Sequence, residues 1–180
     1  MQMTGVARAA GTLIMILAAT SAARAQAAPA TFRTEFLHQF DNSMGKIVAL
    51  AEAVPAETYA RRAVPAVQPL GQIFAHIASY NYEYPARAMG ISPPAGIDRD
   101  TLEQVRDKAQ VVALLRRSAE HVRSSVRQMP EAQLTQTTTL YGRRVPQWAV
   151  LFQLIAHMND HLGQSIAYAR ASGVVPPWSQ

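Results

Sequence analysis

Prolines divide most of this sequence into four stretches in which apolar residues recur every three or four positions. That spacing places the apolar side chains on one face of an α-helix, which has about 3.6 residues per turn. We therefore expect an all-α fold, a four-helix bundle whose helices bury their apolar faces against one another. The expected helices start at or next to Thr31, Pro69, Asp107 and Pro146, and they end before Pro55, at Pro85 or Gly90, before Pro130 and before Gly173.

Local signals support these boundaries. Thr31 is a plausible N-cap for the first helix, and Asp107 has capping-box spacing to Gln110 at the start of the third. The Thr-rich segment 133–144 lacks helical periodicity, so we expect a loop with little regular structure there. Residues 101–106 are expected to form a short turn before the third helix.

The first 25 residues have the features of a cleaved secretory signal peptide. A short N-terminal region with Arg8 precedes the apolar run 13–19, and small residues flank Arg24 as a signal peptidase requires. The apolar run is shorter than the roughly 20 residues that span a bilayer, which argues against a membrane anchor. We expect export to the bacterial periplasm or exterior, no stable membrane insertion after cleavage, and one domain over residues 30–180.

Charge and cysteine content exclude several classes of function. The formal net charge is +5 and falls to +3 once Arg8 and Arg24 leave with the leader. The remaining basic residues are dispersed except for three arginine pairs, so no continuous basic stripe suggests a nucleic-acid partner. The chain contains no cysteine. Disulfides, thiolate metal ligands and a cysteine nucleophile are therefore excluded together.

Two histidines in the last helix indicate a metal site. His157 and His161 lie four residues apart, so their rings project from the same face and can converge on one divalent cation. In the second helix, His76 lies on a polar stripe that flanks the core, where it can face this pair across the bundle. Three imidazoles would hold a zinc-like cation and leave a position for water or substrate, as in catalytic sites.

At these residues the chain resembles the DinB/YfiT-like family of metal-binding four-helix bundles. The resemblance is carried by residues 69–78 around His76, by 157–164 around the histidine pair, and by the tail 168–177. It implies that His76, His157 and His161 bind a divalent metal, commonly zinc or nickel. It also implies thiol transfer as a candidate activity, because some members transfer thiol cofactors such as bacillithiol or mycothiol.

Two classes of function remain open. The first is a metal-dependent enzyme, a hydrolase or thiol transferase acting on an unidentified small molecule, with Glu83 as a candidate general base. The second is a non-catalytic metal-binding or ligand-binding bundle that could form a homodimer through an exposed helix face. Export argues against thiol transfer, because low-molecular-weight thiols are mainly a cytosolic pool. Asp160 and Gln164 are candidates to orient a ligating imidazole, and Tyr80 is a candidate to line a substrate pocket.

Overall fold

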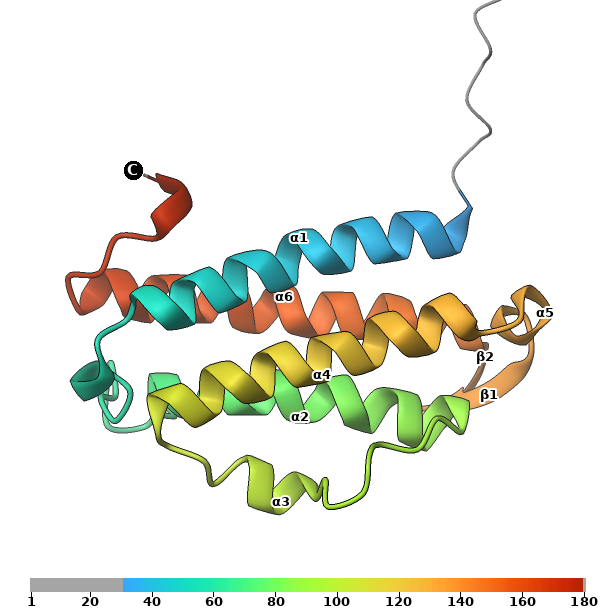
Figure 1. The fold of residues 1–180 in the computed structure, drawn as a ribbon, viewed down its shortest axis with the longest axis horizontal. Helices are drawn as coiled ribbons and strands as arrows, with labels where there is room; N and C mark the ends of the chain where they lie inside the picture. The colour runs from blue at the N-terminus through green and yellow to red at the C-terminus, as the bar shows by residue number, and fades with distance from the viewer. Residues whose placement is uncertain (1–30, 180) are drawn as a thin grey trace, which may run out of the picture.

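Four long helices form the body of the molecule. The structure, a computed structural model, describes residues 31–179 and shows the helices packed side by side (Figure 1). This confirms the expected all-α bundle. The long helices are α1 (Phe32–Ala53), α2 (Leu70–Met89), α4 (Lys108–Gln128) and α6 (Gln147–Ala171).

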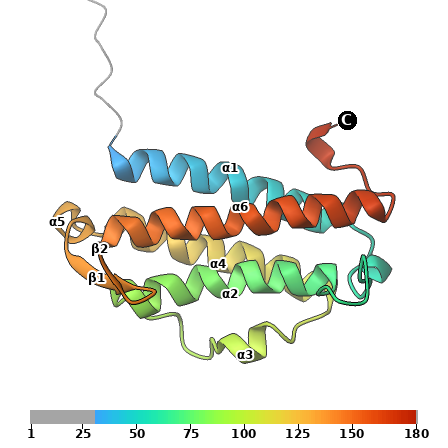
Figure 2. The same cartoon turned by 180° about the vertical axis from the view of Figure 1, so that it is seen from behind.

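The order of the helices around the bundle differs from their order in the chain. Helix α1 packs against α4 and α6, and α2 packs against the same two helices, so α1 and α2 lie diagonally across the core. The colours in Figures 1 and 2 show that α2 and α4 run in one direction and that α1 and α6 run in the opposite one. Neighbours α2 and α6 are therefore antiparallel and lie side by side along most of their length.

The helix starts follow the caps in the sequence. The Thr31 hydroxyl accepts a hydrogen bond from the backbone N–H of Thr34, and the Asp107 carboxylate accepts one from the N–H of Gln110. Helix α2 continues through Pro85 and ends at Gly90, whose positive φ of 69° suits the helix C-terminus. Of the two endings expected for this helix, the structure therefore adopts the later one.

The core lies between the four apolar helix faces. Large side chains from all four helices are almost fully excluded from solvent there, as the expected stripes require. None of the described helices is long and apolar enough to span a membrane. The most deeply buried large side chains are Phe40, Phe74, Met44, Ile47, Leu50, Leu70, Ile73, Ile77, Leu114, Leu115, Leu151 and Leu154.

The connecting segments are more regular than the sequence indicated. Between α4 and α6 the chain forms α5 (Glu131–Leu134) and an antiparallel hairpin of β1 (Thr137–Leu140) and β2 (Arg143–Pro146). The expectation of a loop over 133–144 was therefore wrong. β-Branched threonines favour extended backbone, and a two-residue turn is enough to pair the strands.

Three short elements complete the described fold. The 3₁₀ turn η1 (Ala56–Thr58) follows α1, and α3 (Arg99–Leu102) lies outside α2, at the bottom of Figures 1 and 2. The 3₁₀ turn η2 (Pro177–Ser179) contacts α1 at the end of the chain. The expected leader, residues 1–25, lies outside the described residues.

Candidate metal centre

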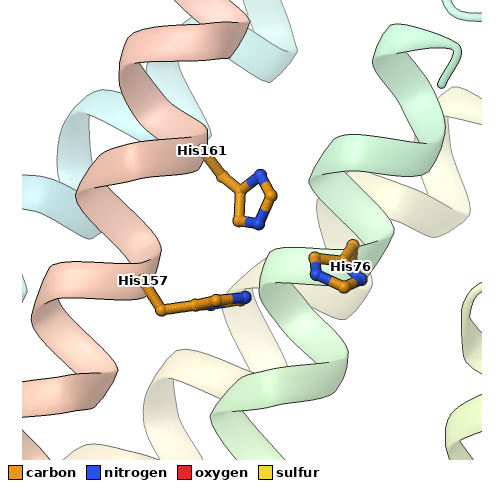
Figure 3. Close-up of side chains that lie close together, drawn as sticks. All are labelled: His76, His157 and His161. Atoms are coloured by element: carbon orange, nitrogen blue, oxygen red, sulfur yellow. The ribbon is translucent and has the colours of Figure 1, made fainter. Parts of the chain in front are cut away.

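Three histidine side chains converge between α2 and α6. His76 comes from α2, while His157 and His161 come from successive turns of α6 and point toward it (Figure 3). One potential ligand atom from each residue lies within 4.8 Å of the other two. The ring centroids of His157 and His161 are 4.6 Å apart, and that of His76 lies 5.2 and 4.8 Å from them. The antiparallel packing of α2 against α6 brings the rings together from distant parts of the sequence.

A carboxylate outside the two helices holds the ring of His76. Glu103, directly after α3, accepts a hydrogen bond from His76 Nδ1 through its Oε1, at 3.0 Å. The same oxygen accepts from the hydroxyl of Ser79 at 2.9 Å and from Arg99 Nε at 3.2 Å. A carboxylate only accepts hydrogen bonds, so His76 Nδ1 carries a proton and the lone pair of a neutral ring lies on Nε2.

These partners also keep Glu103 ionised. Burial raises the pKa of its carboxyl, but hydrogen bonds from Ser79 and Arg99 and the nearby positive charge outweigh burial and lower the pKa overall. An ionised acceptor makes a stronger hydrogen bond to an imidazole N–H than a neutral one does. Glu103 is therefore suited to fix the orientation of His76.

His161 is oriented within its own helix. Its Nδ1 lies 2.9 Å from Oε1 of Gln164, and Gln164 Nε2 donates to the hydroxyl of Tyr168 at 3.2 Å. The amide oxygen accepts from the ring, which leaves the lone pair of His161 on Nε2. Gln164, a candidate for this role in the sequence, thus contacts the ring. Asp160 is exposed on the same helix.

The third ring, His157, packs between aromatic side chains. Its centroid lies 4.2 Å from that of Tyr80 and 5.7 Å from that of Tyr84. Burial, the largest cause, and repulsion from a charged His161 or His76 together lower the pKa of His157 to about 3. Burial also lowers the pKa of His76, against the opposing effect of Glu103. Both rings are therefore neutral near pH 7.

This donor set fits a divalent transition metal. Neutral imidazole nitrogens are ligands that zinc and nickel accept, and here two of the three rings already have their other nitrogen hydrogen-bonded. Within residues 31–179 the cluster contains three histidines and no carboxylate or fourth protein ligand. Three protein ligands with a free position are typical of catalytic zinc sites, whereas structural zinc sites are closed by four.

Glu83 lies about two turns beyond His76 on α2, and its carboxylate is paired with arginines. Its side chain is 10% exposed, and its oxygens pair with Arg87 Nη1 at 3.0 Å and with Arg99 Nε at 2.9 Å. None of the described hydrogen bonds joins it to a histidine of the cluster. The structure places Glu83 in the wall of a pocket that also contains Tyr80 and Tyr84, and its role as general base stays a prediction.

The two remaining histidines of the described chain and the arginine pair of β2 lie away from the cluster. His38 is exposed on α1, as its position opposite the apolar stripe indicates. His121 is half-buried, with its ring 5.1 Å from that of Tyr82. Arg143 and Arg144 are exposed on β2.

Sequence reasoning missed Arg99 and Glu103. The two residues lie four apart on the short α3 segment, where no apolar periodicity marks a packed element. Arg99 also donates to the hydroxyl of Tyr80 at 2.9 Å, so this segment contacts both His76 and a tyrosine that packs on His157. The only sequence signal is an ion pair with helical spacing, which is common on exposed helices and does not identify a site.

Solved structures of bacterial proteins share this fold. A DinB-like protein from Bacillus cereus superimposes with a TM-score of 0.67 at 19% identity, covering 79% of this chain and 93% of that one. YfiT from Bacillus subtilis gives a TM-score of 0.63 at 12% identity, with coverage of 83% and 93%. YfiT is described as a probable metal-dependent hydrolase with an unusual four-helix bundle topology. At these identities the likeness establishes the fold alone.

The family follows from the sequence itself. No curated protein matches the chain. The sequence model of the DinB superfamily, in contrast, matches residues 39–165, which include the greater part of all four long helices and the three converging histidines. The chain belongs to the DinB superfamily.

Proposed function

We propose that this protein is a metal-dependent hydrolase, and that His76, His157 and His161 hold its divalent cation, zinc or nickel. One observation carries the proposal: three half-buried imidazoles from two helices place ligand atoms within 4.8 Å of one another. The printed description of YfiT supports the same chemistry by analogy. A bound cation would supply a Lewis acid that polarises a carbonyl or phosphoryl oxygen.

The residues around the histidines have separate tasks. Glu103 and Gln164 each bind the Nδ1 of one ring and so direct its Nε2 toward the centre of the cluster. The rings of Tyr80 and Tyr84 cover His157 and exclude water from that side. Glu83 faces the neighbouring pocket, where a carboxylate freed from its arginines could accept a proton from a substrate.

Export favours hydrolysis over thiol transfer. We propose that residues 1–25 direct the protein to the periplasm or exterior, because an apolar run is followed there by small residues suited to signal peptidase. The low-molecular-weight thiols used by some members of the family are mainly cytosolic. Water, in contrast, is available to a hydrolase in every compartment.

Metal-dependent stability tests the site. A cation at a hundred times its dissociation constant stabilises the folded state by about 2.7 kcal/mol, so zinc or nickel added to chelator-treated protein should raise the Tm by several degrees. His161→Ala should lose most of this gain yet keep its helical content, because alanine is the best helix former. His38→Ala, on the exposed face of α1, is the matched control and should keep the full gain.

Activity separates a catalytic cation from a structural one. With the metal restored, the wild type should hydrolyse an activated ester such as p-nitrophenyl acetate, and His161→Ala should not. Equal Tm shifts in the wild type and His161→Ala would overturn the ligand assignment. Full metal binding without hydrolysis across a panel of esters, amides and phosphoesters would identify a non-catalytic metal-binding bundle instead.

A further inference from the structure

A pocket of about 170 Å³ opens beside the histidine cluster. It lies between α2, α3 and the tip of the β1–β2 hairpin, so three separate segments of the chain form its walls. Two of its lining side chains, Tyr80 and Tyr84, also contact the ring of His157. A ligand in the pocket is thus separated from the proposed metal ligands by no more than one aromatic ring.

The size and walls of the pocket suit a single aromatic ring. The rings of Tyr80 and Tyr84 are 5.2 Å apart, and Tyr141 meets Tyr84 edge-on at 6.4 Å. A cavity of roughly 150 Å³ is large enough to hold benzene. Aromatic walls favour a flat ring, because stacked and edge-to-face contacts add to the gain from burial.

The charged residues of the pocket leave one cation available for an anion. Arg99 is held by Glu83 and Glu103 and donates to the Tyr80 hydroxyl. Arg87 is 76% exposed, and its one described ion pair is with Glu83, which it shares with Arg99. A guanidinium has five N–H donors, so Arg87 retains several for an anionic group at the pocket mouth.

Tyr141 occupies a backbone position that a tyrosine rarely takes. It and Gly142 form the two-residue hairpin turn, with φ of 50° and 75°, which is the pattern of a type I′ turn. Asparagine or glycine fits the first position without strain, whereas a bulky residue with positive φ is an outlier. The strained residue is 67% exposed, yet its hydroxyl shares a hydrogen bond with that of Tyr84. Strain of this kind is often found at ligand sites, and here it holds a ring over the pocket.

We propose that this pocket is the substrate subsite and that it takes a small aromatic carboxylate of the benzoate type. The ring lies among Tyr80, Tyr84 and Tyr141, and the carboxylate is bound by Arg87. The proposal rests on the proposed function, because it makes the substrate of the metal-dependent reaction a compound that carries such a group. The scissile bond then lies on the side of the ring that faces His157.

The subsite is tested by measuring how benzoate binds to the mature protein, by calorimetry and by protein NMR. Chelator-treated protein is used, so that carboxylate coordination to a metal cannot contribute. Benzoate should bind roughly tenfold more tightly than benzyl alcohol, which lacks the charge, and than acetate, which lacks the ring. Equal affinity for all three probes would overturn the proposal.

Substitutions distinguish the ring site from the charge site. Tyr141→Asn should weaken benzoate binding roughly tenfold without lowering the Tm, because asparagine suits the turn. Tyr141→Phe keeps the ring and should retain binding. Arg87→Gln should reduce the affinity for benzoate to that for benzyl alcohol. The controls Phe152→Ala, an aromatic 66% exposed on α6, and Arg61→Gln, an exposed arginine away from the pocket, should bind benzoate as the wild type does.

His161→Ala separates this proposal from the proposed function. The subsite requires chelator-treated His161→Ala to bind benzoate as the wild type does, whether or not the wild type binds metal or hydrolyses esters. A protein that binds benzoate but no metal would retain the subsite and lose the metal-dependent hydrolase. Benzoate binding that needs metal and is insensitive to Tyr141→Asn and Arg87→Gln would show coordination to the cation and overturn the subsite.

Discussion

His76 is the one histidine of the cluster with a described side-chain hydrogen bond to a residue outside its own helix. Glu103 reaches it from the end of α3 and is itself held by Ser79 and Arg99. Both His161 and its partner Gln164, in contrast, lie on α6. The position of α3 is thereby coupled to the position of a proposed metal ligand.

Removal of Glu103 should weaken metal binding. Partners that orient a ligating imidazole typically contribute 10–100-fold to metal affinity, so Glu103→Ala should raise the zinc Kd by about that factor. Glu103→Gln should fall between the wild type and the alanine variant, because its amide oxygen still accepts from Nδ1 but carries no charge. Competition with a chromogenic chelator gives the affinities, with the exposed Glu57→Ala as control. Wild-type affinity in both Glu103 variants would show that His76 needs no such partner.

Because the fold lowers the pKa of His157, we expect the free energy of unfolding to depend on pH. The ordinary pKa of 6.5 applies in the unfolded chain, whereas the folded protein takes up this proton only near pH 3. As the pH falls below 6.5 the unfolded state therefore binds more protons, and the free energy of unfolding decreases. This contribution is complete above pH 6.5 and is lost progressively between pH 6.5 and about 3.

Urea unfolding of chelator-treated protein between pH 7.5 and 4.5 measures this effect. His157→Gln removes the titrating group, so its free energy of unfolding should fall less steeply with decreasing pH than that of the wild type. The exposed His38→Gln is the control and should keep the wild-type slope. Identical slopes in all three proteins would mean that His157 has the same pKa in the folded and unfolded states.

At the scale of elements, helices were easier to predict than the hairpin. A helix of about twenty residues repeats its apolar spacing several times, and caps such as Thr31 and Asp107 mark where it begins. Each strand of the hairpin has four residues, and Leu140 is the one buried side chain in the two strands. The strands therefore show no alternation of apolar and polar residues. Its turn is Tyr-Gly, which lacks the asparagine that would have signalled a type I′ turn.

The start of α2 contains a glycine that packing requires. A Cβ at Gly71 would lie 2.7 Å from a ring carbon and 3.1 Å from the carbonyl oxygen of Tyr59. The Tyr59 ring is buried, and its hydroxyl donates to the carbonyl of Ala51, so it has little freedom to move away. The backbone N–H of Gly71 also donates to the Tyr59 carbonyl. Gly71 therefore sets how closely the segment after α1 packs on α2.

Two glycine-to-alanine substitutions should have opposite effects. Gly71→Ala should destabilise the protein by about 1–3 kcal/mol, because overpacking outweighs the higher helix propensity of alanine. Gly45→Ala lies in α1, where the added Cβ would meet nothing within 4 Å beyond its chain neighbours and the backbone of its own helix, and it should stabilise by about 0.5–1 kcal/mol. Chemical denaturation of both variants tests the pair. Stabilisation by Gly71→Ala would show that Tyr59 can move.

At the scale of the whole molecule, the convergence of the three histidines was predictable from the sequence but their surroundings were not. The spacing of His157 and His161 and the helical face of His76 follow from helix geometry. The positions of Arg99 and Glu103 depend on how the segment between α2 and α4 folds back over α2. That path is set by long-range packing, such as the burial of Leu102, and no local pattern encodes it.

The proposed export of the chain can be measured directly. The mature protein should begin near Gln26 or Ala28, because the apolar run and the small residues before them have the pattern that signal peptidase recognises. Intact-mass spectrometry of the protein from the periplasmic fraction or the medium gives the new N-terminus. Full-length protein confined to the cytoplasm would contradict the proposed localisation.

The packing of α2 against α6 has a consequence for how the chain is held together. The converging histidines belong to helices that are distant in sequence, and the loop between residues 76 and 157 contains all of α4. A cation shared by these rings would be a cross-link that closes a long loop, the task that a disulfide performs in many exported proteins. This chain has no cysteine with which to make one. Such a cross-link forms only after the last helix has been synthesised, so a chain truncated before residue 157 could not make it, whichever metal were supplied.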